Sequence, residues 1–213
     1  MDRSTRDRFA ARTSSDLTAG NACLETPRPM FEALERRFGP FDLDLTADAA
    51  RHHCRLWLGP DSPLGEPDAL AAFWPAYGRR GFSNPPYGPF VQEILLWAQA
   101  MAGEGFESTL LIPMRVTRSF RKIILPGAAE LLFCDARIPF FENGVPRLND
   151  TSWEKGELRA DGAMFDSIVV RFAPGHVGQP RLGEFEVPSC VTPDDLERAS
   201  CLRRERERAT LTP

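Results

Sequence analysis

"RGFSNPPYGPFVQEILLWAQA", residues 80–100, combines a strand pattern, a stiff corner and a helix pattern in one short stretch. Residues 80–84 predict a short strand, and residues 89–102 predict a helix with apolar side chains along one side. Pro85 and Pro86 fix φ at two successive positions and have no N–H, so neither element continues through the corner. In an open α/β sheet, a junction of this kind lies at the carboxyl edge, where such sheets bind ligands.

The alternation of strand and helix continues on both sides of this unit, which predicts an α/β fold of three layers with a mostly parallel sheet. Residues 165–172 follow the strand at 129–135 without an intervening helix, as an antiparallel edge strand would. Strands are also expected at 41–45, 55–58 and 108–114, and helices at 27–38, 68–74 and 117–125.

The start of the first helix and the two faces of the first strand can be predicted residue by residue. Thr26 is expected as the N-cap of the helix and Pro27 as its first residue. In the strand "FDLDL" (41–45), the apolar residues Phe41, Leu43 and Leu45 are expected on one face, with Asp42 and Asp44 on the other.

Composition bounds the domain organisation and the class of protein. The chain has 213 residues, 42% of them hydrophobic, which is enough for one core. We expect a mobile N-terminal arm at 1–22, one domain at 23–175, and a C-terminal appendage at 176–213 that contains a helix opened by Thr192 and Pro193. A formal net charge of −4 lacks the basic surplus of many nucleic-acid-binding domains but is compatible with a local basic patch.

Cysteine usage and hydropathy point to the cytoplasm. The five cysteines include no CxxC pair, which fits reduced thiols. No apolar run approaches the roughly 20 residues that span a bilayer, and the N-terminus lacks the apolar segment of a secretory signal. His52, His53 and Cys54 are neighbours, but adjacent residues seldom converge on one ion, so we expect no metal site.

The corner itself has the chemistry of a socket for a planar amino group. Its prolines fix the direction of backbone carbonyls, Asn84 adds a side-chain carbonyl beside them, and Tyr87 adds a flat ring. Two convergent acceptors take both hydrogens of the amine, so that its lone pair points at an electrophile while the ring stacks on the planar group. Such a site works by positioning and electrostatic stabilisation. The structural alternative is a proline-rich turn with Tyr87 packed on the core.

"NPPY" resembles the catalytic motif of S-adenosylmethionine-dependent methyltransferases that act on amino groups. The wider chain is similar to the phage-type DNA N6-adenine methyltransferases over about residues 25–174. The similar segments, in order, are "TPRPMFEALERRFGPFDLDLTADAA", "DAL…FW", "GFSNPPYG", "LLIPMR", "AELLFCDARIPF" and "FDSIVVRF".

The resemblance implies a Rossmann-like methyltransferase fold, S-adenosylmethionine as cofactor, and a flipped adenine of DNA as substrate in the cytoplasm of a phage's or prophage's bacterial host. It also implies catalytic roles for Asn84, Pro85, Pro86 and Tyr87, and cofactor contacts from Thr26, Pro27, Asp44 and Asp68. The chain departs from many methyltransferases in having "DLDLTADAA" where a glycine-rich loop is expected, and Leu45 where the family commonly has proline. Asp44 has the alternative role of capping the next helix.

The sequence leaves alternatives open for the class of substrate and for the surface that contacts it. The same socket fits a glutamine amide of a protein or an exocyclic amine of RNA, and a non-catalytic cofactor-binding relative is a further alternative. Arg115, Arg118, Arg121 and Lys122 are spaced to share a helical face that contacts phosphates, or they form an ordinary solvated face. The polar loop at 142–163 is either a base-reading or clamping element or a flexible surface loop.

Overall fold

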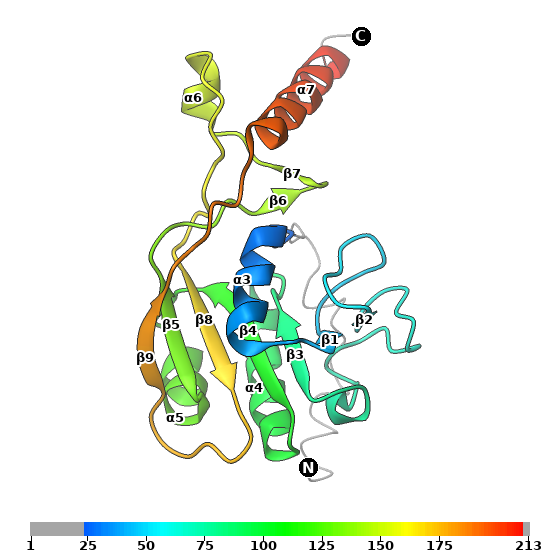
Figure 1. The fold of residues 1–213 in the computed structure, drawn as a ribbon, viewed down its shortest axis with the longest axis vertical. Helices are drawn as coiled ribbons and strands as arrows, with labels where there is room; N and C mark the ends of the chain where they lie inside the picture. Colours follow the sequence, from blue (N-terminus) through cyan, green and yellow to red (C-terminus); the bar gives the residue numbers. More distant parts are fainter. Residues whose placement is uncertain (1–23, 211–213) are drawn as a thin grey trace.

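A computed structural model describes residues 24–210, so the expected N-terminal arm lies outside the described residues. Its centre is a seven-stranded sheet in the order β2-β1-β3-β4-β8-β5-β9 (Figure 1). Only β8 runs antiparallel to its neighbours in this sheet. The strands are β1 (Leu43–Asp44), β2 (Leu56–Trp57), β3 (Arg80–Ser83), β4 (Glu107–Pro113), β5 (Glu130–Cys134), β8 (Ser167–Phe172) and β9 (Arg181–Phe185).

The prediction of an antiparallel strand at 165–172 is confirmed, but its predicted place at the edge of the sheet is wrong. β8 pairs with β4 on one side and β5 on the other, and β9 forms the edge beyond β5. Of the residues of β9, only Phe185 is buried, so its sequence "RLGEF" gives almost no hydrophobic signal. The sheet therefore reaches residue 185, past the range 23–175 expected for the domain.

Side chains alternate between the two faces of the sheet and build two cores, which confirms the three layers. Ile168, Val170 and Phe172 of β8 join the core under α4, whereas Val169 joins the core under α3. Phe41 was expected to share a face with Leu43 and Leu45 but packs in the α3 core, because β1 begins only at Leu43. The helices of these layers are α3 (Arg28–Phe38), η1 (Trp74–Ala76), α4 (Pro89–Gly103), η2 (Phe120–Ile124) and α5 (Leu125–Gly127).

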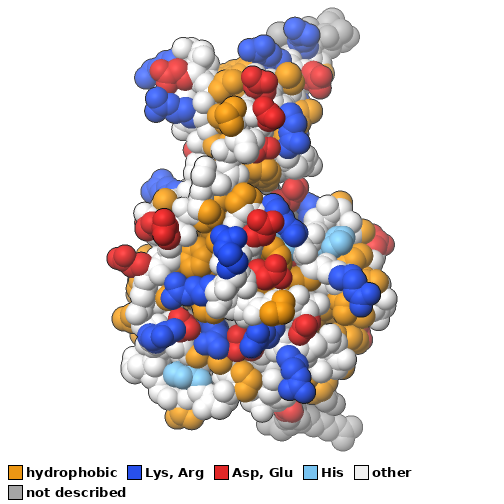
Figure 2. All heavy atoms as spheres, viewed as in Figure 1, with side chains coloured by type: hydrophobic (Ala, Val, Ile, Leu, Met, Phe, Trp, Pro, Cys, Tyr) orange, Lys and Arg blue, Asp and Glu red, His pale blue; other side chains and the backbone are white. Residues whose placement is uncertain are grey.

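A smaller accessory lobe, residues 141–163 and α7 (Pro193–Thr210), stands beyond one end of the sheet across a narrower waist (Figure 1, Figure 2). The loop expected at 142–163 is folded there into the hairpin β6 (Phe141–Glu142) and β7 (Val145–Pro146) and the short helix α6 (Asp150–Glu154).

The start of α7 is confirmed, because Thr192 and Asp195 form a reciprocal capping box. The Asp195 N–H donates to Thr192 Oγ1 at 3.2 Å, and the Thr192 N–H donates to Asp195 Oδ2 at 3.0 Å. Across residues 24–210, no helix combines the length and apolar character needed to cross a membrane.

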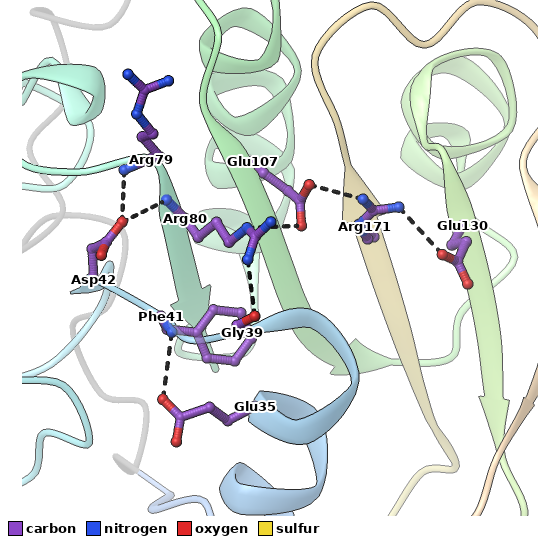
Figure 3. Close-up of polar contacts among 9 residues, drawn as sticks. All are labelled: Glu35, Gly39, Phe41, Asp42, Arg79, Arg80, Glu107, Glu130 and Arg171. Carbon is purple, nitrogen blue, oxygen red and sulfur yellow. Dashed lines mark hydrogen bonds and ion pairs between the residues drawn. The ribbon is translucent and has the colours of Figure 1, made fainter.

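An ion-pair ladder joins β4, β5, β8 and β9 at the amino end of the parallel strands, away from the proline corner; Figure 3 shows its central part around Arg171. Because β8 is antiparallel, its Arg171 lies beside the first residues of β4 and β5. Its guanidinium contacts Glu107 at 2.8 Å and Glu130 at 3.2 Å. The Glu130 side chain is only 6% exposed and also pairs at 2.8 Å with Arg181 of β9, whose side chain is 73% exposed.

Replacing Arg171 and Arg181, two of the arginines that pair with Glu130, should separate a largely buried ion pair from one whose arginine is exposed. We expect Arg171→Leu to lower the free energy of unfolding by about 2–4 kcal/mol, because it removes the cation that lies between two largely buried carboxylates, Glu107 and Glu130. The matched change Arg181→Leu should cost below about 1 kcal/mol, because solvent screens an exposed pair. Urea denaturation of both variants measures the difference, and equal losses would contradict the assignment.

Candidate active site at the carboxyl ends of β1 and β3

One cavity of about 730 Å³ opens where β1 and β3 end. Its volume lies within the range of about 300–1,000 Å³ typical of small-molecule sites, and its walls are largely apolar with a few polar groups. Residues expected at the site from distant parts of the sequence meet here. They are Thr26, Asp44, Asp68, Asn84, Pro85, Pro86 and Tyr87.

Asn84 lines this cavity and carries an unpaired side-chain acceptor. Its side-chain Nδ2 donates to the Leu24 carbonyl oxygen at 2.9 Å, which fixes the orientation of the amide. Its Oδ1 is buried and has no hydrogen-bond partner within residues 24–210. A buried acceptor without a donor costs about 1–3 kcal/mol, so this oxygen is prepared to accept from a ligand.

The rest of the corner turns the chain from β3 into α4. Pro85 is buried and Tyr87 is half-buried, with its ring edge-on to Phe140 at a centroid distance of 6.2 Å. Burial raises the pKa of Tyr87, so the phenol stays neutral. Gly88 caps α4 at φ 123°, a conformation that side chains with a Cβ rarely adopt. The corner therefore ends the strand and places Tyr87 in the wall of the cavity.

The N-terminus of α3 differs from the prediction by one residue. Pro27 occupies the N-cap, at φ −57° and ψ 140°, and its carbonyl accepts from Met30 and Phe31. Thr26 is therefore not the cap; its Oγ1 is buried without a partner in the described chain, and the residue lines the cavity. Pro27 is buried at the helix start and is not among the described residues that line the cavity.

Asp44 is a buried carboxylate at the end of β1, only 3% exposed. It does not cap a helix: its oxygens accept from the backbone N–H of His53 at 3.1 Å and, more weakly, of Thr46 at 3.5 Å. Burial raises its pKa to about 6, and these two N–H bonds partly oppose the rise. The group is thus mostly ionised at neutral pH and poised to accept hydrogen bonds from a ligand.

His53 is a site residue that the sequence pattern did not identify. Its ring stacks on Phe31 at a centroid distance of 4.5 Å, and its Nε2 lies 3.0 Å from the Thr26 carbonyl. Because a carbonyl only accepts, Nε2 carries the hydrogen. Burial lowers the pKa of His53 to about 4, so the ring is neutral and acts as a brace between two walls of the cavity. No spacing rule in the sequence connects His53 to Thr26.

The outer rim of the cavity is made by the loops after β1 and β2. Asp48 forms an ion pair with Arg51, and Asp68 accepts from the Leu70 N–H at 2.8 Å. Gly59, at φ 139°, lies so close to Ala47 that an added Cβ would meet the Ala47 carbonyl oxygen at 2.0 Å. The glycine that lets the backbone approach closely thus follows β2, not β1, where the sequence lacks a glycine-rich loop.

The three neighbours His52, His53 and Cys54 point into different surroundings. His52 stacks on Trp57 at 4.2 Å, whereas Cys54 is buried in the α3 core, where burial raises its pKa. Over residues 24–210, no group of three or more histidine, cysteine and acidic side chains is arranged to hold a metal ion.

The four predicted DNA-contacting cations are exposed beside the same edge of the sheet. Arg115 follows the end of β4 and stacks on Phe165 at 4.0 Å, and its charge slightly offsets the burial that raises the pKa of Tyr87. The other three lie on the helical segment that follows. They are Arg118, Arg121 and Lys122.

A mostly parallel sheet with one antiparallel strand, and a ligand-sized cavity at the carboxyl ends of β1 and β3, define a Rossmann-like methyltransferase fold. Residues 14–164, more than half of the chain, match the family DNA N-6-adenine-methyltransferase (Dam). The chain belongs to this family and is a DNA adenine methyltransferase. None of the curated proteins compared with the chain matches it.

The raised pKa of Asp44 predicts a pH-dependent cost to the fold. The folded carboxyl titrates near 6 and the unfolded one near 3.8, so the folded state binds the extra proton and stability falls as pH rises through this window. Relative to Asp44→Asn, we expect the wild-type protein to lose about 2 kcal/mol of unfolding free energy between pH 4 and pH 8. Chemical denaturation at several pH values measures this difference, and a pH-independent difference would contradict it.

Proposed function

We propose that this protein transfers a methyl group from S-adenosylmethionine to N6 of an adenine flipped out of duplex DNA and into the cavity. The observation that carries the proposal is the buried, unpaired Oδ1 of Asn84, a residue that lines the cavity and whose amide is oriented by the bond from Nδ2 to the Leu24 carbonyl. An adenine N6 amine offers the donors that this acceptor lacks.

Asn84 and the proline corner would act on the amine by orientation. The nitrogen lone pair of adenine N6 is delocalised into the ring, which makes the amine a poor nucleophile. Accepting its hydrogens at Asn84 Oδ1 and at a corner carbonyl favours a pyramidal nitrogen with a directed lone pair. Tyr87 supplies the stacking face for the base, and its neutral phenol adds no charge to the site.

The residues beside the corner fit the cofactor. Asp44 is a largely ionised, buried acceptor suited to an ammonium or ribose hydroxyl group, and the unpaired Thr26 Oγ1 lines the same cavity. Asp68 also lines the cavity, and we assign it to the cofactor's adenine end. When bound, S-adenosylmethionine would supply an electrophilic methyl group to the amine held at Asn84.

Base flipping follows from the position of the acceptor. The Asn84 Oδ1 atom is buried, and N6 of a stacked and paired adenine is buried as well, so the two can meet only if the base leaves the helix. The exposed cations Arg115, Arg118, Arg121 and Lys122 would bind the phosphates beside the flipped nucleotide, because they lie at the sheet edge where the corner ends β3.

Asn84→Ala should lower kcat for adenine methylation by roughly 10²–10³-fold, as the loss of one oriented polar group does at comparable sites. Binding of S-adenosylmethionine, measured by calorimetry, should change by less than about threefold, because Asn84 acts on the amine. Nucleoside analysis of defined duplexes after reaction with labelled cofactor measures the transfer.

Ser83→Ala is the matched control, because it removes a buried polar group from the preceding residue, where Ser83 Oγ lies 2.8 Å from Thr46 Oγ1. We expect that variant to keep transfer within about tenfold. Full transfer by Asn84→Ala would disprove the proposed role of Asn84. Label in RNA or protein, with none in DNA adenine, would disprove the proposed substrate.

Charge removal at the helical segment should change the salt dependence of DNA binding. Replacing Arg118, Arg121 and Lys122 by glutamine should reduce the slope of log K against log salt by about 0.9 for each phosphate that these cations neutralise in the wild type. Arg79→Gln is the matched control, because Arg79 is exposed just before β3, at the opposite edge of the sheet. Equal slopes for the triple variant and the wild type would place the DNA elsewhere.

A further inference from the structure

The orientation of the Asn84 amide is set by a residue far away in the sequence. If the amide were rotated by 180°, its oxygen would face the Leu24 carbonyl oxygen and its NH₂ group would face the cavity. In that arrangement two hydrogen-bond acceptors, Asn84 Oδ1 and the Leu24 carbonyl oxygen, would repel each other, and the target amine would meet a donor instead of an acceptor. The bond of 2.9 Å from Nδ2 to the Leu24 carbonyl therefore selects the one orientation that serves transfer.

The Leu24 carbonyl is held in place by its neighbour Glu25. The Glu25 N–H donates to the Phe141 carbonyl at 2.8 Å, and the Phe141 N–H donates back to the Glu25 carbonyl at 2.9 Å. Glu25 thereby pairs with β6 as an isolated antiparallel bridge. Its carboxylate also accepts from the Gly144 N–H, with its two oxygens at 3.2 and 3.3 Å.

The turn that receives this carboxylate is built to present an N–H group. Asn143 at φ 55° and Gly144 at φ 74° are both left-handed, as the two central residues of a type I′ hairpin turn are. The carbonyl of Gly144 accepts from the guanidinium of Arg198 at 2.8 Å, so α7 holds the same turn from the other side.

The segment is anchored on its other side as well. Thr26, directly after Glu25, gives its carbonyl to the buried ring of His53 at 3.0 Å, and the Leu24 side chain packs against the α3 core. The Leu24 carbonyl thus lies between one attachment to the sheet domain and one to the accessory lobe. Of these attachments, the carboxylate of Glu25 is the side-chain contact to the lobe. Glu25 also lines the cavity, but it belongs to neither β1 nor β3, so its replacement leaves the residues of those strands in place.

We propose that Glu25 is a positioning residue for methyl transfer: its carboxylate fastens the 24–26 segment to the β6–β7 turn, so that the Leu24 carbonyl holds the Asn84 amide with Oδ1 toward the target amine. The inference rests on the catalytic role proposed for Asn84. The accessory lobe would then help to orient Asn84. Gly144 is hydrogen-bonded to the Glu25 carboxylate, Glu25 is the neighbour of Leu24 in the chain, and the Leu24 carbonyl is hydrogen-bonded to Asn84.

The kinetic test uses the full chain with three changes at Glu25. Glu25→Ala should lower kcat by roughly ten- to a hundredfold, because a small displacement of an oriented group has effects of this size. KM for the cofactor should stay within about threefold. Glu25→Gln keeps an acceptor oxygen and should restore kcat to within about threefold of wild type, whereas Glu25→Asp, one methylene shorter, should resemble Glu25→Ala. Glu142→Ala removes one negative charge from β6, the strand with which Glu25 pairs, and should leave kcat unchanged.

A second measurement reports on the Asn84 amide directly. Its side-chain ¹⁵N–¹H₂ signals can be assigned by their absence in Asn84→Asp. In the wild type and Glu25→Gln, the proton bonded to the Leu24 carbonyl should exchange slowly with water. In Glu25→Ala, the exchange should be at least about tenfold faster, while the thermal unfolding temperature shows whether the fold is intact.

The outcomes separate this inference from the proposed function. Wild-type kcat and unchanged amide exchange in Glu25→Ala would overturn the positioning role, as would equal loss of kcat in Glu25→Gln. Full transfer by Asn84→Ala would overturn the catalytic role of Asn84 instead, and the exchange measurement would still decide whether Glu25 orients that amide.

Discussion

The register between β1 and β3 is the constraint on which the site depends. β1 has only two residues, and it places Asp44 opposite Phe82, two residues before Asn84. Because side chains alternate along a strand, a slip of one residue would turn Asp44 into a core and expel Leu43 from it. The register is secured by the bond from the Leu45 N–H to the Phe82 carbonyl at 2.7 Å and by Gly81, where an added Cβ would lie 2.9 Å from the Leu45 side chain. The register therefore fixes where the ends of β1 and β3, with Asp44 and Asn84, meet at the cavity.

Much of the sheet could be predicted because its signals are local. Runs such as those of β4 and β8 are apolar on both faces, and the corner at 84–87 stops one element and starts another through proline chemistry alone. The sequence also indicated that β8 follows β5 as an antiparallel partner. It did not indicate β9, since a mostly exposed edge strand has no apolar periodicity, and so β8 was placed at the edge that β9 occupies.

The contacts that tune the site could not be predicted, because they join residues that no local pattern links. Asn84 and Leu24 are 60 positions apart, and the Glu25 carboxylate meets a turn 119 positions away. The role of Thr26 changed for a related reason. A threonine before a proline has the pattern of an N-cap, yet Pro27, with ψ 140°, takes the cap position itself and the helix begins at Arg28. The hydroxyl of Thr26 therefore does not cap the helix, and the residue lines the cavity. The capping rule thus identified Thr26 as a notable residue but predicted a helix-capping hydrogen bond that it does not make.

The cavity concentrates groups that weaken the fold on their own. Asp44 carries a charge that burial opposes, and within the described chain the oxygens Asn84 Oδ1 and Thr26 Oγ1 lack donors. Apolar side chains of similar shape would remove these costs, so stability alone does not account for three such groups around one cavity. Each is an acceptor, and each would be satisfied by a donor from a bound molecule. A ligand rich in N–H and O–H groups, together with an amine to be methylated, supplies that set of donors, and its binding energy would offset what these groups cost the fold.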